Sequence, residues 1–172
     1  MAVKRTGLIK VGGKDATVIG NDVKVGEVAP DFTLHTNDWA PMRGLADTAG
    51  KVRILAAVPS LDTSVCDRET RRFNQEVAGL PGAHVYVVSM DLPFAQKRWC
   101  GAAGIDRVTT LSDHRDASFG KAWGVLIPSV RLHTRAVFVV DRADVVRHAE
   151  YLPDVGQEPD YAAAVAAVKK LL

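Results

Sequence analysis

Residues 52–79 read VRILAAVPSLDTSVCDRETRRFNQEVAG and contain three successive elements. The mostly apolar run Val52–Val58 is typical of a strand that is covered on both faces. Apolar residues then recur at Val65, Phe73 and Val77, a spacing that predicts a helix ending near Gly79. A strand, a short loop and a helix therefore follow one another here.

The same alternation continues along the chain. Further strands are predicted over 84–91, 107–113 and 135–141, and helices over 93–104 and 158–172. Strands that alternate with helices predict an α/β fold with a central, partly parallel sheet. Residues 135–151 predict a closing antiparallel hairpin, and residues 1–28 an N-terminal β-hairpin extension around GGKD. We expect one domain spanning 1–172.

Charge and hydropathy exclude several classes of function. The 172 residues carry a net charge of +2, from 22 basic and 20 acidic side chains that form no block or stripe. This pattern argues against nucleic acid and membrane surfaces as partners. An early positive pair is followed by an apolar stretch that ends at Lys10, too short for a signal peptide. We therefore expect a cytoplasmic protein.

The two cysteines, Cys66 and Cys100, leave several interpretations open. They are not arranged as Cys-x-x-Cys, and neither lies in a Cys/His cluster with metal-ligand spacing. Composition alone favours buried small hydrophobes, because free cysteine is among the most buried residue types. A stray pair and a redox couple are the alternatives.

The residues around Cys66 favour a reactive thiol. Ser64 and Asp67 fit a capping pattern that would begin a helix at Val65 and place Cys66 in its first turn. Unpaired amides and the helix dipole favour an anion there, and the thiolate is the reactive form of cysteine. Thr63 could place a hydroxyl beside the sulfur or serve only as a cap, and Pro59 could rigidify the loop or simply end the strand.

Taken together, Pro59, Thr63 and Cys66 form P-x-x-x-T-x-x-C, which resembles the active-site motif of the peroxiredoxins. The segments PSLDTSVCDRETRRFN, SMDLPFAQKRWCGAAGIDRVTTLSD and RAVFVVD resemble those of its thiol peroxidase branch, the bacterial atypical two-cysteine peroxiredoxins. The resemblance covers nearly the whole chain. It implies a thioredoxin-like fold with a central mixed sheet flanked by helices.

The resemblance also implies an activity and its residues. Cys66 corresponds to the peroxidatic cysteine and Cys100 to the resolving cysteine, and the two would form an intramolecular redox disulfide. Thr63 and an arginine on a late strand would hold the peroxide oxygens, and Pro59 would shape the loop. We assign the arginine to Arg135 because the family's arginine directly precedes the apolar strand, with Arg131 as its competitor.

Substrates and partners follow from the same resemblance. It implies reduction of alkyl or lipid hydroperoxides and hydrogen peroxide, thioredoxin as reductant, a homodimer, and no metal or organic cofactor. Two other functions compete with it: a disulfide reductase or thiol carrier on the same fold, and a non-catalytic binding module with buried cysteines. The lack of Cys-x-x-Cys argues against the former. The five histidines, none with a partner at metal spacing, are expected at the surface or alone in the core.

Overall fold

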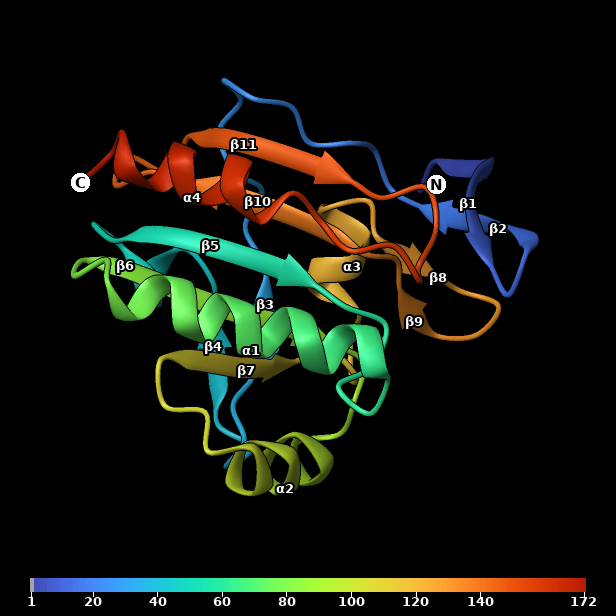
Figure 1. Cartoon of the computed structure of the whole chain (residues 1–172). Coiled ribbons are helices and arrows are strands. Elements are labelled where there is room, and N and C mark those ends of the chain that lie inside the picture. The colour runs from blue at the N-terminus through green and yellow to red at the C-terminus, as the bar shows by residue number, and fades with distance from the viewer. Residues whose placement is uncertain (1) are drawn as a thin grey trace.

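A seven-stranded mixed sheet forms the centre of the computed structural model, which describes residues 2–172 (Figure 1). Strands β5, β6 and β7 are parallel, and the strands on either side are antiparallel to their neighbours. The spatial order is β11 (Val146–Tyr151), β10 (Ala136–Val140), β5 (Val52–Ala57), β6 (Ala83–Ser89), β7 (Val108–Ser112), β3 (Thr33–His35) and β4 (Pro41–Arg43). The predicted mixed sheet and its closing hairpin, β10–β11, are confirmed.

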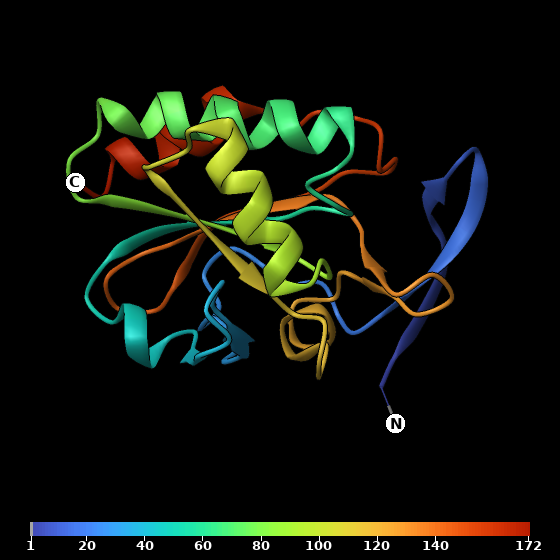
Figure 2. The same ribbon diagram turned by 90° about the horizontal axis from the view of Figure 1, so that it is seen from below.

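Helices cover both faces of this sheet (Figure 2). On one face, Ile54 and Ala56 pack with residues of α1 (Ser64–Ala78) and α4 (Tyr161–Lys169). On the other face, Leu55 and Ala57 pack in one cluster with Phe119 of α3 (Ser118–Ala122) and with Trp123, which follows that helix. Successive strand residues point to opposite faces, so cover on both sides explains why every residue of β5 except Arg53 is apolar. Helix α2 (Pro93–Ala103) packs against β7 (Figure 1).

The N-terminal hairpin forms as predicted but belongs to a second sheet. Strands β1 (Lys4–Val11) and β2 (Lys14–Ile19) pair antiparallel across a turn at Gly12 and Gly13, both with positive φ. Strand β2 then pairs with β8 (Leu126–Ile127), and β8 with β9 (Leu132–His133). The organisation of 1–172 as one domain stays a prediction.

Several local details differ from the sequence prediction. Thr63, not Ser64, caps α1, so the helix begins one residue earlier than expected. Helix α4 begins at Tyr161 and is capped by Asp160, after the predicted Pro159 start. The short elements α3, β4, β8, β9 and the 3-10 helix η1 (Ala46–Thr48) were not predicted, because none is long enough to establish an apolar period.

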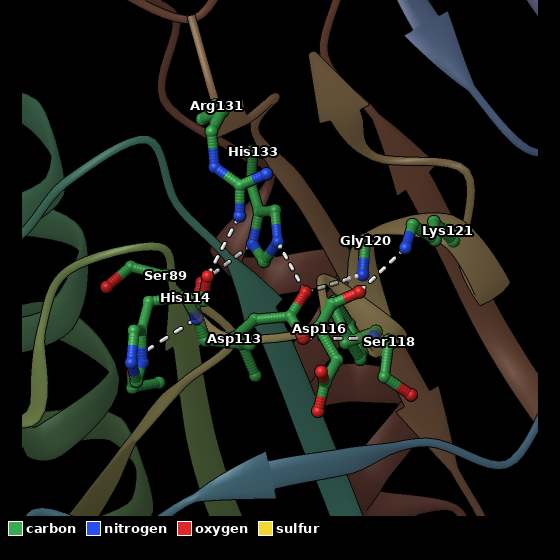
Figure 3. A network of polar contacts seen from close by, with 12 residues as sticks. Ser89, Asp113, His114, Asp116, Ser118, Gly120, Lys121, Arg131 and His133 are labelled. Carbon is green, nitrogen blue, oxygen red and sulfur yellow. Dashed lines mark hydrogen bonds and ion pairs between the residues drawn. The ribbon is translucent and has the colours of Figure 1, made fainter. Parts of the chain in front are cut away.

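A buried carboxylate holds α3 against β9 (Figure 3). Asp113 accepts hydrogen bonds from the amides of Phe119 and Gly120, at 3.1 and 2.8 Å, and lies 2.9 Å from Nε2 of His133. The Asp113 and His133 side chains are both fully or almost fully buried. The expectation that each core histidine would be solitary is therefore wrong for His133, because its carboxylate partner lies 20 positions away in the sequence.

We predict that His133→Leu lowers the free energy of unfolding by about 1–3 kcal/mol, because it removes one hydrogen-bond partner of the buried Asp113 carboxylate. Urea denaturation measures the loss. The double variant Asp113→Asn/His133→Leu should recover only part of it, because asparagine removes the buried charge but turns its NH2 group toward one of the two backbone amides that donate to Asp113. A loss in His133→Leu of less than about 1 kcal/mol would contradict this interpretation.

Candidate functional site

Cys66 lies where the sheet passes into its first helix. Strand β5 ends at Ala57, buried Pro59 follows, and the chain turns into α1 at Thr63. Thr63 Oγ1 accepts a hydrogen bond from the Cys66 amide at 3.3 Å and donates one to the Ser60 carbonyl at 3.1 Å. Cys66 is thus in the first helical turn, as predicted, and its side chain is fully buried. The Thr63 hydroxyl, which is exposed, acts as the cap.

The guanidinium of Arg135 contacts the sulfur. Its Nη2 donates to Cys66 Sγ at 3.1 Å, although the two residues lie 69 positions apart. The Val155 carbonyl accepts from both Nε and Nη2, at 3.1 and 2.8 Å, which fixes the plane of the group. Arg131, the competing arginine, instead donates to the His114 carbonyl at 2.9 Å (Figure 3). Of the two arginines, the structure therefore places only Arg135 at Cys66.

Glu69 completes this cluster, and the sequence analysis missed it. It lies three residues after Cys66, hence on the same face of α1, and its Oε2 forms an ion pair with Arg135 Nη1. Its Oε1 is buried without a hydrogen-bond partner. In the sequence Glu69 stands among Arg68, Arg71 and Arg72, which suggests a solvated helix face.

Burial governs the charge of this acid. Loss of solvation raises the pKa of Glu69 to about 7, even though Arg135 favours the carboxylate. Burial also disfavours the charge of Arg135, but the negative charges of Glu69 and Cys66 outweigh it and raise the pKa of the guanidinium. Arg135 is thus a cation shared between a carboxyl group and a sulfur atom.

Cys100 lies on α2 in a polar environment of its own. Its Sγ is 3.2 Å from Thr110 Oγ1 on β7 and 4.0 Å from Asn37 Nδ2. Asn37 and Thr110 also bond to each other, at 3.1 Å. Both Cys66 and Cys100 are free thiols, Cys66 buried and Cys100 half-buried. The structure therefore holds the two predicted cysteines in separate contacts.

A hollow opens between α1 and α2 beside Thr63. Trp99, the neighbour of Cys100, donates from Nε1 to Asp67 Oδ1 on α1 at 3.0 Å, and the Arg71 guanidinium lies over its ring. The hollow has a volume of about 460 Å³ and is lined by Leu61, Asp62, Thr63, Ser64, Asp67, Arg68 and Trp99. Among residues 2–172, no group of three or more metal-ligating side chains is present.

The raised pKa of Glu69 predicts a specific dependence of stability on pH. Between about pH 4.5 and 7 the folded protein binds a proton at Glu69 that the unfolded chain releases, so the free energy of unfolding falls as pH rises. The slope due to this one group approaches about 1.4 kcal/mol per pH unit. In Glu69→Gln this fall should be absent, as urea denaturation at pH 5 and pH 8 would show. Glu76→Gln, on the outer face of α1, should keep it; an unchanged pH dependence in Glu69→Gln would refute the assignment.

Comparisons with known proteins agree on one family. The model of the family described as Redoxin matches residues 24–165. Thiol peroxidase of Halalkalibacterium halodurans is 53% identical over 93% of this chain and 96% of its own length. Thiol peroxidase of Bacillus subtilis is 52% identical over 93% of this chain and 95% of its own length.

A solved structure gives the same result. The peroxiredoxin-like protein of Aquifex aeolicus superposes with a TM-score of 0.88 and 37% identity, covering 97% of this chain and 99% of that one. Thiol peroxidase of Chromobacterium violaceum, at 22% identity and a TM-score of 0.86, shares the fold. The chain therefore belongs to the Redoxin family and, within it, to the thiol peroxidases.

Proposed function

We propose that this peroxidase reduces alkyl or lipid hydroperoxides and hydrogen peroxide at Cys66. The observation that carries the proposal is the 3.1 Å contact between Arg135 Nη2 and Cys66 Sγ at the first turn of α1. A fixed cation and a helix N-terminus both stabilise negative charge on sulfur, and the thiolate is the nucleophile. A lone buried cysteine serving only as core would require neither.

The first chemical step uses Cys66, Arg135 and Thr63. The thiolate attacks the terminal oxygen of the hydroperoxide, the O–O bond breaks, and an alcohol or water leaves after taking up a proton. Cys66 is oxidised to a sulfenic acid while the peroxide is reduced. Arg135 stabilises the charge that develops on the peroxide oxygens, and the Thr63 hydroxyl binds them from the side of the hollow. Pro59 limits the freedom of the loop that presents Thr63.

The second step uses Cys100. Its thiol condenses with the Cys66 sulfenic acid, forms an intramolecular disulfide and releases water. Thioredoxin then returns both cysteines to thiols by thiol–disulfide exchange. Because the present partners of the two sulfurs are Arg135 and Thr110, both contacts have to break before the disulfide can form.

The setting of the enzyme completes the proposal. We infer a homodimer that acts in the cytoplasm, without a metal or organic cofactor. Within residues 2–172, no helix is long and apolar enough to cross a membrane. The scattered charges of the chain support neither nucleic acid nor a membrane surface as a partner.

Cysteine variants test the two steps. Cys66→Ser should abolish peroxide-dependent consumption of NADPH in the presence of thioredoxin and thioredoxin reductase, because the nucleophile is lost. Cys100→Ser should lose that turnover too, yet still consume about one equivalent of peroxide, because Cys66 can be oxidised once. Retained turnover in Cys66→Ser would rule out the mechanism.

Arginine variants test the electrostatic role. Arg135→Lys keeps the charge but loses the planar set of donors that reaches sulfur, Glu69 and Val155 at once. We expect the rate of Cys66 oxidation by peroxide to fall about 100-fold, the scale of losing one fixed transition-state donor. Arg131→Lys is the matched control and should react at the wild-type rate. Equal rates in the two variants would show that Arg135 has no special role.

A further inference from the structure

The segment SMDLPFAQ, residues 89–96, links the peroxide-reacting loop to the helix that carries Cys100. It leaves the end of β6 and enters α2. Asp91, near its start, reaches across to the loop after β5: one carboxylate oxygen accepts from Ser60 Oγ at 2.7 Å, and the other accepts from the Leu61 amide at 2.9 Å. None of the steps described above uses Asp91.

A buried glutamine on α2 determines which groups donate and which accept in this segment. Gln96 is fully buried, and its Nε2 donates to the Leu111 carbonyl at 2.9 Å and to Ser89 Oγ at 3.0 Å. The Asp91 amide also donates to Ser89 Oγ, at 3.3 Å. Since the Ser89 oxygen already accepts, its own proton points to Asp91 Oδ2, 2.7 Å away. Three donors thus converge on one carboxylate.

The network continues from Asp91 to Cys66 through one peptide plane. The amide of Leu61 and the carbonyl of Ser60 belong to the same planar peptide group, so holding the N–H also aims the C=O. That carbonyl accepts from the Thr63 amide at 3.2 Å and from the Thr63 hydroxyl at 3.1 Å. Thr63 Oγ1 in turn accepts from the Cys66 amide. Hydrogen bonds therefore run without a gap from Gln96 to Cys66.

We propose that Asp91 is a positioning residue for peroxide reduction. It holds the Ser60–Leu61 peptide so that the Thr63 hydroxyl is directed at the incoming peroxide, and through Ser89 and Gln96 it ties this loop to α2. The inference rests on the proposed function, since it assigns Thr63 the task of binding peroxide. Among the described residues, Arg135 and Glu69 form no hydrogen bond with Asp91, so the contact between Arg135 and the sulfur does not pass through it.

Asp91→Asn tests this role, because an amide offers one acceptor and two donors to three groups that all donate. We expect the second-order rate of Cys66 oxidation by peroxide to fall about 10- to 100-fold, the scale of a misplaced reacting group. Alkylation of Cys66 by iodoacetamide should keep its wild-type rate and pH midpoint. Asp106→Asn, which removes one exposed acid from the loop between α2 and β7, is the charge-matched control and should leave both reactions unchanged.

Two outcomes would overturn the inference: wild-type oxidation of Cys66 in Asp91→Asn, or an equal fall in oxidation and alkylation, which indicates general loss of structure. If peroxide fails to oxidise Cys66 in the wild-type protein, the proposed function itself fails. If peroxide oxidises Cys66 equally fast in the wild-type protein and in Asp91→Asn, the proposed function stands and only the role of Asp91 is refuted.

Ser60→Ala gives a second, milder test that keeps the hydrogen bonds of the Ser60–Leu61 peptide group, although the Asp62 amide loses its acceptor, Ser60 Oγ. It removes one of the three donors to Asp91 and should slow the oxidation of Cys66 by peroxide about 3- to 10-fold. A change of this size lies within the range of interaction energies between residues of one hydrogen-bond network. In the Asp91→Asn background the same change should have a smaller effect than in the wild-type protein, because the two side chains share one hydrogen bond. Additive effects of the two substitutions would contradict the proposed connection.

Discussion

The contact between Arg135 and Cys66 is the constraint on which the rest of the site depends. A guanidinium that is almost fully buried has to find partners for its donors, and here these are the sulfur, the Glu69 carboxyl and the Val155 carbonyl. Burying such a cation costs several kcal/mol unless it is paired and hydrogen-bonded. The fold meets this requirement only when α1, the start of β10 and the segment before α4 come together. The electrostatic environment of Cys66 therefore depends on how these three elements pack together.

Glu69 makes that contact adjustable. It competes with the sulfur for the same guanidinium, and its pKa of about 7 means that its own charge changes near neutrality. When the carboxyl is protonated, the full charge of Arg135 faces Cys66; when it is ionised, the charge is divided. A change in the charge of Glu69 therefore alters how much of the charge of Arg135 faces Cys66.

Two carboxylates near the ends of neighbouring parallel strands fix the surrounding frame. Asp91, after β6, holds the loop before Cys66, and Asp113, after β7, holds α3 against the strand that precedes Arg135. Loops need such contacts because their amides have no ladder partners. Much of the α/β pattern was predictable, since β5 and α1 are long enough to show their periods. The choice between Thr63 and Ser64 as the cap of α1 was not, because both offer the same side-chain chemistry at adjacent positions.

Local sequence patterns predicted the longer strands and helices, the place of Cys66 in a first helical turn, and the family, because these depend on residues close together in the chain. Only the tertiary structure decided that Arg135 rather than Arg131 reaches the sulfur, that Glu69 is buried with it, and that Asp91 connects the two cysteine-bearing segments. Each of these facts depends on a contact set by sheet order and register, such as the pairing of β10 with β5. Cys66 and Arg135 lie 69 positions apart and meet because the pairing of β10 with β5 brings the residue before β10 to the helix that follows β5.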